Sequence, residues 1–362
     1  MLQVQEKDTR SEGLRNWTLN IEIKIQGETK TMTKHINRTL LLLAVGLFLA
    51  SACSRKDTAK DETTAAKAGA DMATKAMQPA PNIVELAAVG KTFIGPSEIP
   101  AGWTTFKFTN KSDMVHFAII DVLPKGVSAK QLSDDVMAPF QDAMNAMIAG
   151  DEAATKAAFE KFPEWIAQLT RNGGPGILGA HETGQTTVYI EPGEYVVECY
   201  VKTNGVFHST PASDGTFGMM LPLTVTANEG KTAEPKSNMT ISITNAGYKI
   251  LDGALHQGAN TIRVNFDEQQ AFPSVTGNDI HLMKITSADD ARAANDWMDW
   301  RKTHGLESPA PVKFLGGIND LPAGTHGYFT VDLQPGDYEF IGEQPDPKAT
   351  GFVLPVTVVE EG

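Results

Sequence analysis

The stretch that decides the fold is TVYIEPGEY at residues 187–195, because a close copy, TVDLQPGDY, stands at residues 330–338. The two copies lie 143 residues apart, and Gly173-Gly174 recurs as Gly316-Gly317 at the same offset. Repeats of this kind indicate that one structural unit occurs twice in the chain. We therefore predict a tandem duplication.

The repeated units have the signals of β-structure. A further match pairs GMMLPLTV at 218–225 with GFVLPVTV at 351–358, and residues 103–108 and 261–266 alternate in polarity with the period of two that is typical of strands. The Pro-Gly pair inside each repeated block predicts a tight turn into the next strand. We expect an all-β chain with two tandem Greek-key β-sandwiches, in which two half-apolar sheets bury one another.

The predicted domains are residues 82–227 and 237–360, joined by a linker from Ala227 to Ser237. Each contains a helical insertion. In the first domain, apolar residues recur at helical spacing over 128–148, with Ser128 as the N-cap. The helix is expected to continue over 159–169, with Pro163 interrupting it. The shorter equivalent in the second domain is 289–300.

Composition limits the classes of partner. The chain has 362 residues, and 31 Lys and Arg against 44 Asp and Glu give a net charge of −13, which excludes a basic nucleic-acid-binding surface. Hydrophobic residues make up 41%, enough for a sizeable core. Because the chain has only 2 cysteines, a framework of several disulfides is excluded.

The N-terminal region has the sequence pattern of an export signal. Lys34 and Arg38 precede an unbroken apolar run at 40–50, which is too short to span a bilayer but typical of a signal peptide. We predict a signal peptide at 32–52 that begins at Met32. Residues 1–31 are then a misannotated N-terminal extension.

The small residues 50–52 followed by Cys53 resemble a bacterial lipobox, which predicts lipidation of Cys53. Ser54 resembles a signal for outer-membrane rather than inner-membrane sorting, and residues 53–81 are expected to be a flexible tether. The expected location is the periplasm or the outer membrane, with membrane contact through the lipid anchor only. The alternative is ordinary secretory cleavage, with Cys53 as a bystander.

Four side chains in the first domain raise the question of a metal. An early His116 is followed much later by Cys199, His208 and Met219, just before a last strand at 221–225. This order resembles the cupredoxin (blue copper, plastocyanin-like) family, over residues 85–226 in sequence and over 237–360 in fold alone. The resemblance implies one copper ion in the first domain, with His116, Cys199 and His208 as equatorial ligands and Met219 as the weak axial ligand. Such a set accommodates both Cu(I) and Cu(II).

The ligand spacing is wider than in plastocyanin-like loops, with steps of nine from Cys199 to His208 and of eleven to Met219. The Asn204-Gly205 pair between them could form a hairpin that brings the ends together. Met220 is an alternative axial ligand. Each of these residue types, taken alone, is more often a packing residue than a ligand. His181, in a glycine-bounded loop, is expected to face solvent.

The second domain serves as an internal control. His281 corresponds to His116, but the position of Cys199 is Gly342 and that of Met219 is Phe352. We therefore predict that this domain keeps the fold without a copper site.

Catalytic functions are disfavoured. Cys199 is flanked by Glu198 and Tyr200, and the sequence has no His-x-His pair of the kind that multicopper enzymes use for further coppers. No spacing suggests a nucleophile with a base. The prediction is a non-enzymatic, exported, lipid-anchored electron carrier with an unidentified redox partner protein, its second domain a spacer or docking surface. Two alternatives stay open: a metal-free adhesion or partner-binding β-sandwich lipoprotein, and a periplasmic copper chaperone or buffer.

Overall fold

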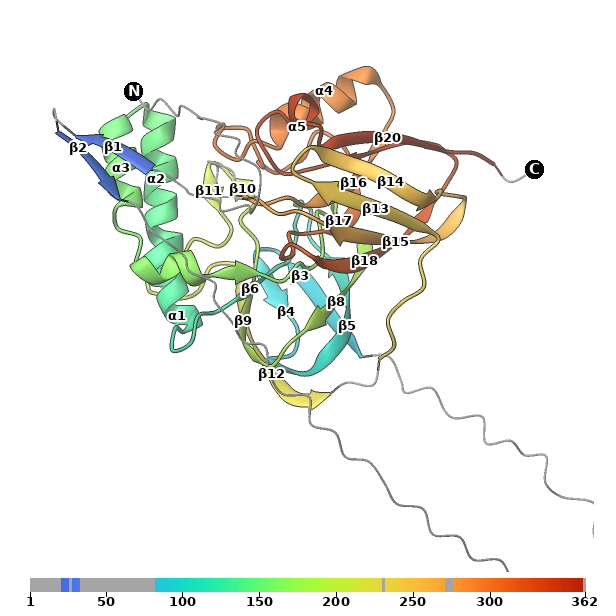
Figure 1. The fold of residues 1–362 in the computed structure, drawn as a ribbon, viewed down its shortest axis with the longest axis horizontal. Coiled ribbons are helices and arrows are strands. Elements are labelled where there is room, and N and C mark those ends of the chain that lie inside the picture. The colour runs from blue at the N-terminus through green and yellow to red at the C-terminus, as the bar shows by residue number, and fades with distance from the viewer. Residues whose placement is uncertain (1–20, 26–27, 33–81, 230–231, 271–275, 361–362) are drawn as a thin grey trace, which may run out of the picture. The chain divides into compact units, whose positions relative to one another are not determined.

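The computed structural model describes residues 21–25, 28–32, 82–229, 232–270 and 276–360 (Figure 1). Near the N-terminus, β1 (Ile21–Ile25) and β2 (Glu28–Met32) form an antiparallel hairpin. The predicted signal peptide beyond Met32, the lipidation site Cys53 and the tether lie outside the described residues. Within those residues, no helix combines the length and apolarity needed to cross a membrane.

The described residues from 82 onward belong to one compact unit. Its first half is a β-sandwich. The strands are β3 (Ile83–Val89), β4 (Thr92–Ile94), β5 (Glu98–Asn110), β6 (Ile119–Val122), β7 (Thr170–Arg171), β8 (Thr183–Ile190), β9 (Gly193–Glu198) and β12 (Met220–Glu229). The long strand β5 belongs to both layers. Its start pairs in parallel with β12, and the rest pairs in parallel with β3 and antiparallel with β8. The other layer continues from β12 through β9 and β6 to β7.

The helical insertion follows β6. It consists of α1 (Ala129–Leu132), a π-helical turn (Ser133–Met137), α2 (Ala138–Ala149), α3 (Glu152–Phe159) and a 3-10 turn (Glu164–Gln168). Ser128 caps α1 as predicted, accepting the Gln131 N–H. The continuation predicted over 159–169 is interrupted at Pro163 as expected, but it is not α-helical: α3 ends at Phe159 and only a 3-10 turn follows Pro163. Gly150, with φ of 71°, ends α2, the Asp151 carboxylate then starts α3 by accepting the Ala154 N–H, and Pro163 leaves room for only a 3-10 turn after it.

The second half repeats this arrangement of strands. Its strands are β13 (Met239–Thr244), β14 (Gly247–Gly253), β15 (Gly258–Phe266), β16 (Ile280–Ile285), β17 (Phe314–Ile318), β18 (Thr325–Leu333), β19 (Gly336–Ile341) and β20 (Val353–Val358). β15 pairs in parallel with β13 and antiparallel with β18, as β5 does with β3 and β8. The helices are α4 (Ala288–Trp297), which begins and ends slightly earlier than predicted, and α5 (Pro347–Thr350).

The repeated sequence blocks make the same contacts in both halves. The Tyr195 hydroxyl donates to the Glu191 carbonyl at 2.8 Å, and the Tyr338 hydroxyl donates to the Gln334 carbonyl at 2.7 Å. A Cβ at Gly174 would meet a backbone carbonyl oxygen at 2.1 Å, and one at Gly317 would meet another at 2.2 Å. The second glycine of each repeated pair is therefore required by the close approach of a neighbouring backbone segment.

The two halves share one sheet. β8 of the first half pairs antiparallel with β18 of the second, through Thr187 and Tyr328, so the order β14-β13-β15-β18-β8-β5 is continuous. The second half's other sheet has the order β17-β16-β19-β20. Figure 1 shows the halves side by side, with a short hairpin, β10 (Lys202–Thr203) and β11 (Val206–Phe207), between the helical insertion and the second half.

Candidate metal centre

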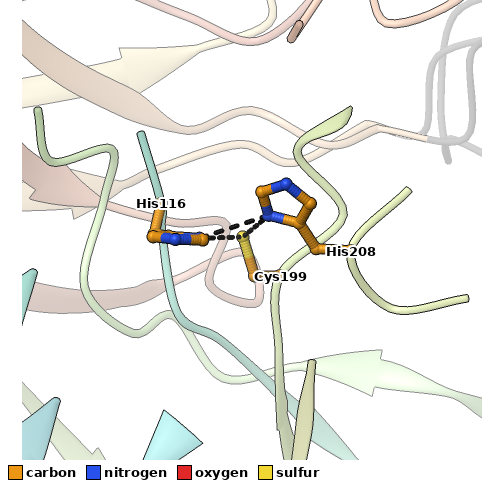
Figure 2. Close-up of side chains that lie close together, drawn as sticks. All are labelled: His116, Cys199 and His208. Atoms are coloured by element: carbon orange, nitrogen blue, oxygen red, sulfur yellow. Dashed lines mark hydrogen bonds between the residues drawn. The ribbon is translucent and has the colours of Figure 1, made fainter. Parts of the chain in front are cut away.

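Three of the predicted ligands meet inside the first half. Cys199 Sγ lies 3.5 Å from His116 Nδ1 and 3.9 Å from His208 Nδ1, and the two Nδ1 atoms are 3.2 Å apart (Figure 2). All three residues are buried, with 0%, 0% and 2% exposure for Cys199, His116 and His208. In the part of the chain that the structure describes, they are the one group of three or more His, Cys, Asp and Glu side chains close enough to hold a metal ion.

The triangle of donor atoms has the size of a metal site. The circle through Sγ and the two Nδ1 atoms has a radius of about 2.1 Å, which matches the metal–nitrogen and metal–sulfur bond lengths of roughly 2.0 to 2.3 Å in protein zinc sites. One thiolate and two imidazoles form the donor set that favours copper in a trigonal arrangement. The residues present therefore fit a copper ion.

His116 is positioned by a short loop that follows β5. Its N–H donates to the Leu178 carbonyl and its carbonyl accepts from the Leu178 N–H, so the backbone is fixed on both sides. The buried Asn110 side chain fastens the loop, donating to the Met114 and Gly179 carbonyls and accepting from the Ser112 N–H. The Ser112 hydroxyl then lies 2.9 Å from His116 Nε2, which leaves Nδ1 facing Cys199.

The predicted Asn-Gly hairpin brings Cys199 and His208 together. β10 and β11 are antiparallel, and Asn204 and Gly205 have φ values of 55° and 73°, as a two-residue hairpin turn requires. The His208 N–H donates to the Val201 carbonyl. The wide spacing between the two ligands is thus taken up by the hairpin.

Thr203 at the end of β10 orients the second imidazole. Its hydroxyl lies 2.8 Å from His208 Nε2, in the same relation that Ser112 has to His116. Partners of this kind fix the ring and the tautomer of a metal-binding histidine. Sequence reasoning missed both hydroxyl groups, although the Asn-x-Ser turn before His116 was a usable signal.

The predicted axial residue, Met219, is joined to two of the three predicted ligands by backbone hydrogen bonds. Its N–H donates to the His208 carbonyl, and its carbonyl accepts from the Cys199 N–H at 3.1 Å. Its side chain is fully buried. Met220 instead packs with Leu132 and Val136 of the helical insertion, in a separate apolar cluster. The structure thus favours Met219 over Met220 as the residue next to the site, and the axial role stays a prediction.

Burial sets the protonation of the three groups. Removal from water lowers the pKa of His116 to about 4 and, together with the neighbouring His116, lowers that of His208 to about 2. The same effect raises the pKa of the Cys199 thiol to about 12. At neutral pH the imidazoles are therefore neutral, as metal ligands must be, while the thiol keeps its proton until a cation displaces it.

The second half supports the ligand hairpin directly. The Glu307 carboxylate accepts the backbone N–H groups of Asn204 and Gly205, and the Lys202 N–H donates to the Leu306 carbonyl at 2.8 Å. The Ser308 N–H donates back to the Lys202 carbonyl. Beyond the spacer or docking role expected from the sequence, this half helps to hold the loop that carries His208.

The corresponding place in the second half is filled. The Gly342 N–H donates to the Phe352 carbonyl, just as the Cys199 N–H donates to the Met219 carbonyl, which supports the correspondence of positions. A Cβ at Gly342 would lie 2.7 Å from the Tyr248 hydroxyl. His281 is buried, with Nδ1 accepting the Ile177 N–H and Nε2 2.8 Å from Asp279. Both ring nitrogens of His281 are thus held by protein groups.

The remaining predicted residues are accounted for as follows. His181 is exposed as expected, and its Nε2 lies 2.9 Å from the Asp113 carboxylate. Cys199 forms no disulfide. Cys53 lies outside the described residues.

No protein-family model matches the chain, and comparison with curated protein sequences gives no match. The chain is similar to solved structures of copper proteins. One is a reduced auracyanin from the photosynthetic bacterium Roseiflexus castenholzii, with 17% identity and a TM-score of 0.25 over 33% of this chain and 94% of that one. Another is auracyanin A, a blue copper protein from Chloroflexus aurantiacus, with 18% identity and a TM-score of 0.23 over 41% and 100%.

A blue copper oxidase from Nitrosomonas europaea is similar over a longer span, with 13% identity and a TM-score of 0.18 over 76% of this chain and 85% of that one. Two of the similar structures are named as blue copper proteins, the kind of protein that the sequence resembles. With TM-scores this low, these likenesses add nothing to what the geometry of the site supports.

Proposed function

We propose that this protein is an exported, lipid-anchored carrier of single electrons that binds one copper ion in its first half. His116, Cys199 and His208 would hold the ion, with Met219 as the weak axial ligand. The observation that carries the proposal is the buried triangle of one sulfur and two neutral imidazole nitrogens. Its partner would be another redox protein.

The chain's own residues suit electron transfer. Copper bound to a thiolate and two imidazoles supplies a centre that changes by one electron between Cu(I) and Cu(II). The Ser112 and Thr203 hydroxyls fix both rings, and the hairpin fixes the loop between Cys199 and His208. Burial excludes water from all three donor atoms. A site held in this way changes little in shape when its charge changes.

A carrier is favoured over an enzyme by the residues that flank the thiol. Cys199 stands between Glu198 and Tyr200, whereas a multicopper oxidase needs histidines there to hold further coppers. Export and anchoring rest on the sequence alone, on the apolar run at 40–50 and on Cys53.

The test is metal analysis and a visible spectrum of the purified chain after loading with Cu(II). We expect one copper per chain and an intense thiolate-to-Cu(II) absorption band. Cys199→Ser should remove the band and leave a folded protein. The matched control, Cys53→Ser, should keep the band but lose the lipid, and with it the association with membranes.

Each rival function predicts a different result. Bound copper without colour would favour a chaperone or buffer that uses the same ligands. Failure to retain any copper would overturn the proposal and favour an adhesion or partner-binding module.

A further inference from the structure

The sheet that the two halves share ends in a strand with a free outer side. Among the described residues, β14 is the last strand of the order β14-β13-β15-β18-β8-β5, at the end farthest from the first half (Figure 1). Only its start is covered, where the Tyr248 N–H donates to the Gly351 carbonyl. Residues 249–253 are exposed. Such an edge offers unpaired backbone N–H and C=O groups to a further strand.

The exposed part of β14 combines two apolar residues with two opposite charges. Ile250 is 38% exposed and Leu251 is 51% exposed. Lys249 precedes this pair and Asp252 follows it. Covering the two apolar side chains would remove their surface from water, which favours a partner strand at this edge.

A bulge in β14 decides which of its side chains share a face. In the register with β13, Lys249 lies opposite Ser242 and Asp252 lies opposite Thr240, while Leu251 is the extra residue. Thr240 and Ser242 are two residues apart, so they share a face of the sheet. Residues directly opposite each other on neighbouring strands point to the same side. Lys249 and Asp252 therefore share that face as well.

The edge is complementary to a second copy of itself. When two copies of β14 are laid antiparallel with Ile250 opposite Leu251, Lys249 of each copy faces Asp252 of the other. Two ion pairs then flank two apolar pairs, and both kinds of cross-strand pair stabilise a sheet. Moving the register by one residue places Lys249 opposite Leu251 or Gly253 and loses both ion pairs.

The bulge is what makes this pairing possible. Without it, residues three apart in a strand would point to opposite faces, and Lys249 could not face Asp252 in an antiparallel pair that keeps the two faces of the sheet. Bulges commonly turn an edge strand away from other chains. In β14 the bulge also brings the two charges to one face, so the edge discriminates in favour of its own sequence.

We propose that β14 is an interface between two copies of this chain, joined antiparallel about a two-fold axis. The shared sheets of the two copies then form one continuous sheet. Each copy occupies the free edge of the other, so assembly through this edge closes at a dimer. The interface involves no copper, and the proposal is independent of the electron-carrier function.

The test is sedimentation equilibrium of the full, metal-free chain over a range of concentrations, with Cys53→Ser so that a lipid cannot drive association. We expect a reversible equilibrium of monomer and dimer. Lys249→Asp places like charges opposite each other twice in the symmetric pair, and it should weaken dimerisation about tenfold or more. Asp252→Lys should do the same. The double variant, Lys249→Asp with Asp252→Lys, restores opposite charges at both places and should restore dimerisation.

A matched control separates this interface from a general effect of net charge. Lys125→Asp makes the same change of charge at an exposed position before the helical insertion, and it should leave dimerisation unchanged. A chain that stays monomeric at every concentration would overturn the proposal. So would a double variant that associates no better than the single variants. Dimerisation that none of these substitutions alters would place the contact on another surface and equally reject the β14 interface.

Discussion

The hydroxyl groups of Ser112 and Thr203 stand in the same relation to two different imidazole rings. Each lies within hydrogen-bond distance of Nε2, so that Nδ1 of His116 and of His208 points at the sulfur. The rings come from segments 92 residues apart in the chain, yet the outer contact is of the same kind. The orientation of the donor atoms is therefore set by residues that are not themselves predicted metal ligands.

Loss of one such hydroxyl should weaken metal binding without removing a ligand. Thr203→Ala frees His208 to rotate, and partners of this kind are typically worth about 10-fold to 100-fold in metal affinity. Thr203→Ser keeps a hydroxyl and should restore most of the affinity. Competition titration with a copper chelator measures the effect, with the exposed Thr183→Ala as a control. Equal affinities in Thr203→Ala and wild type would contradict the positioning role.

Copper uptake should release one proton per ion near neutral pH. The lowered pKa values of His116, about 4, and His208, about 2, leave both rings neutral above about pH 5, while the raised pKa of Cys199, about 12, keeps the thiol protonated. Affinity should therefore rise about tenfold per pH unit between roughly pH 5 and 9. Chelator competition across this range measures the slope. A slope of two or three protons would show that a histidine is charged in the metal-free protein.

At the scale of elements, the hairpin of β10 and β11 is formed by a local turn signal and is held by a residue distant in the sequence. The Asn204-Gly205 turn was predictable, because the pair encodes the positive φ values that the turn needs. The hydrogen bonds from that turn to the Glu307 carboxylate were not predictable, because Glu307 lies about a hundred residues further along the chain. Cys199, His208 and Met219 were recognisable from their order in the sequence, whereas the contacts of Thr203 and Glu307 emerge only from the folded arrangement.

Glu307→Ala should loosen the ligand loop from the second half. The Asn204 and Gly205 N–H groups would lose their acceptor, and leaving such donors unpaired costs about 1–3 kcal/mol where they are buried, less where water reaches them. We expect a lower unfolding temperature of the metal-free protein and a weaker copper affinity. Glu307→Gln retains one acceptor oxygen and should show a smaller loss of both. If Glu307→Ala altered neither quantity, the loop would not depend on this contact.

At the scale of the whole molecule, the repeated blocks predicted two β-sandwiches but not how they combine. The pairing of β8 with β18 makes one continuous sheet. The alternation of polar and apolar residues in each of these strands is already explained by packing within its own half. Nothing in a local pattern encodes which sheet edge meets which, because every edge strand offers the same backbone groups. By contrast, the break before the 3-10 turn was visible in the sequence, because Pro163 interrupts the helical pattern there.

Lys202 links the two halves and makes their union sensitive to pH. It is fully buried, and its ammonium donates to the Trp300 and Lys302 carbonyls at 2.8 and 2.6 Å. Burial lowers the pKa of Lys202 from 10.5 to about 8. Below pH 8 the folded and unfolded chains both hold this proton. Between about pH 8 and 10 the unfolded chain holds a proton that the folded chain has lost, so the free energy of unfolding should rise with pH.

The size of this rise follows from the shift in pKa and can be isolated with a matched pair of variants. A difference of about 2.5 pKa units corresponds to about 3 kcal/mol over the whole window. Urea unfolding of wild type and Lys202→Met from pH 7.5 to 10.5 should show the wild type gaining about that much relative to the variant. Lys107→Met, at an exposed position, should follow the wild-type profile. A constant difference between wild type and Lys202→Met would mean that the buried amine keeps its proton, and that the carbonyls of the second half stabilise its charge as well as water does.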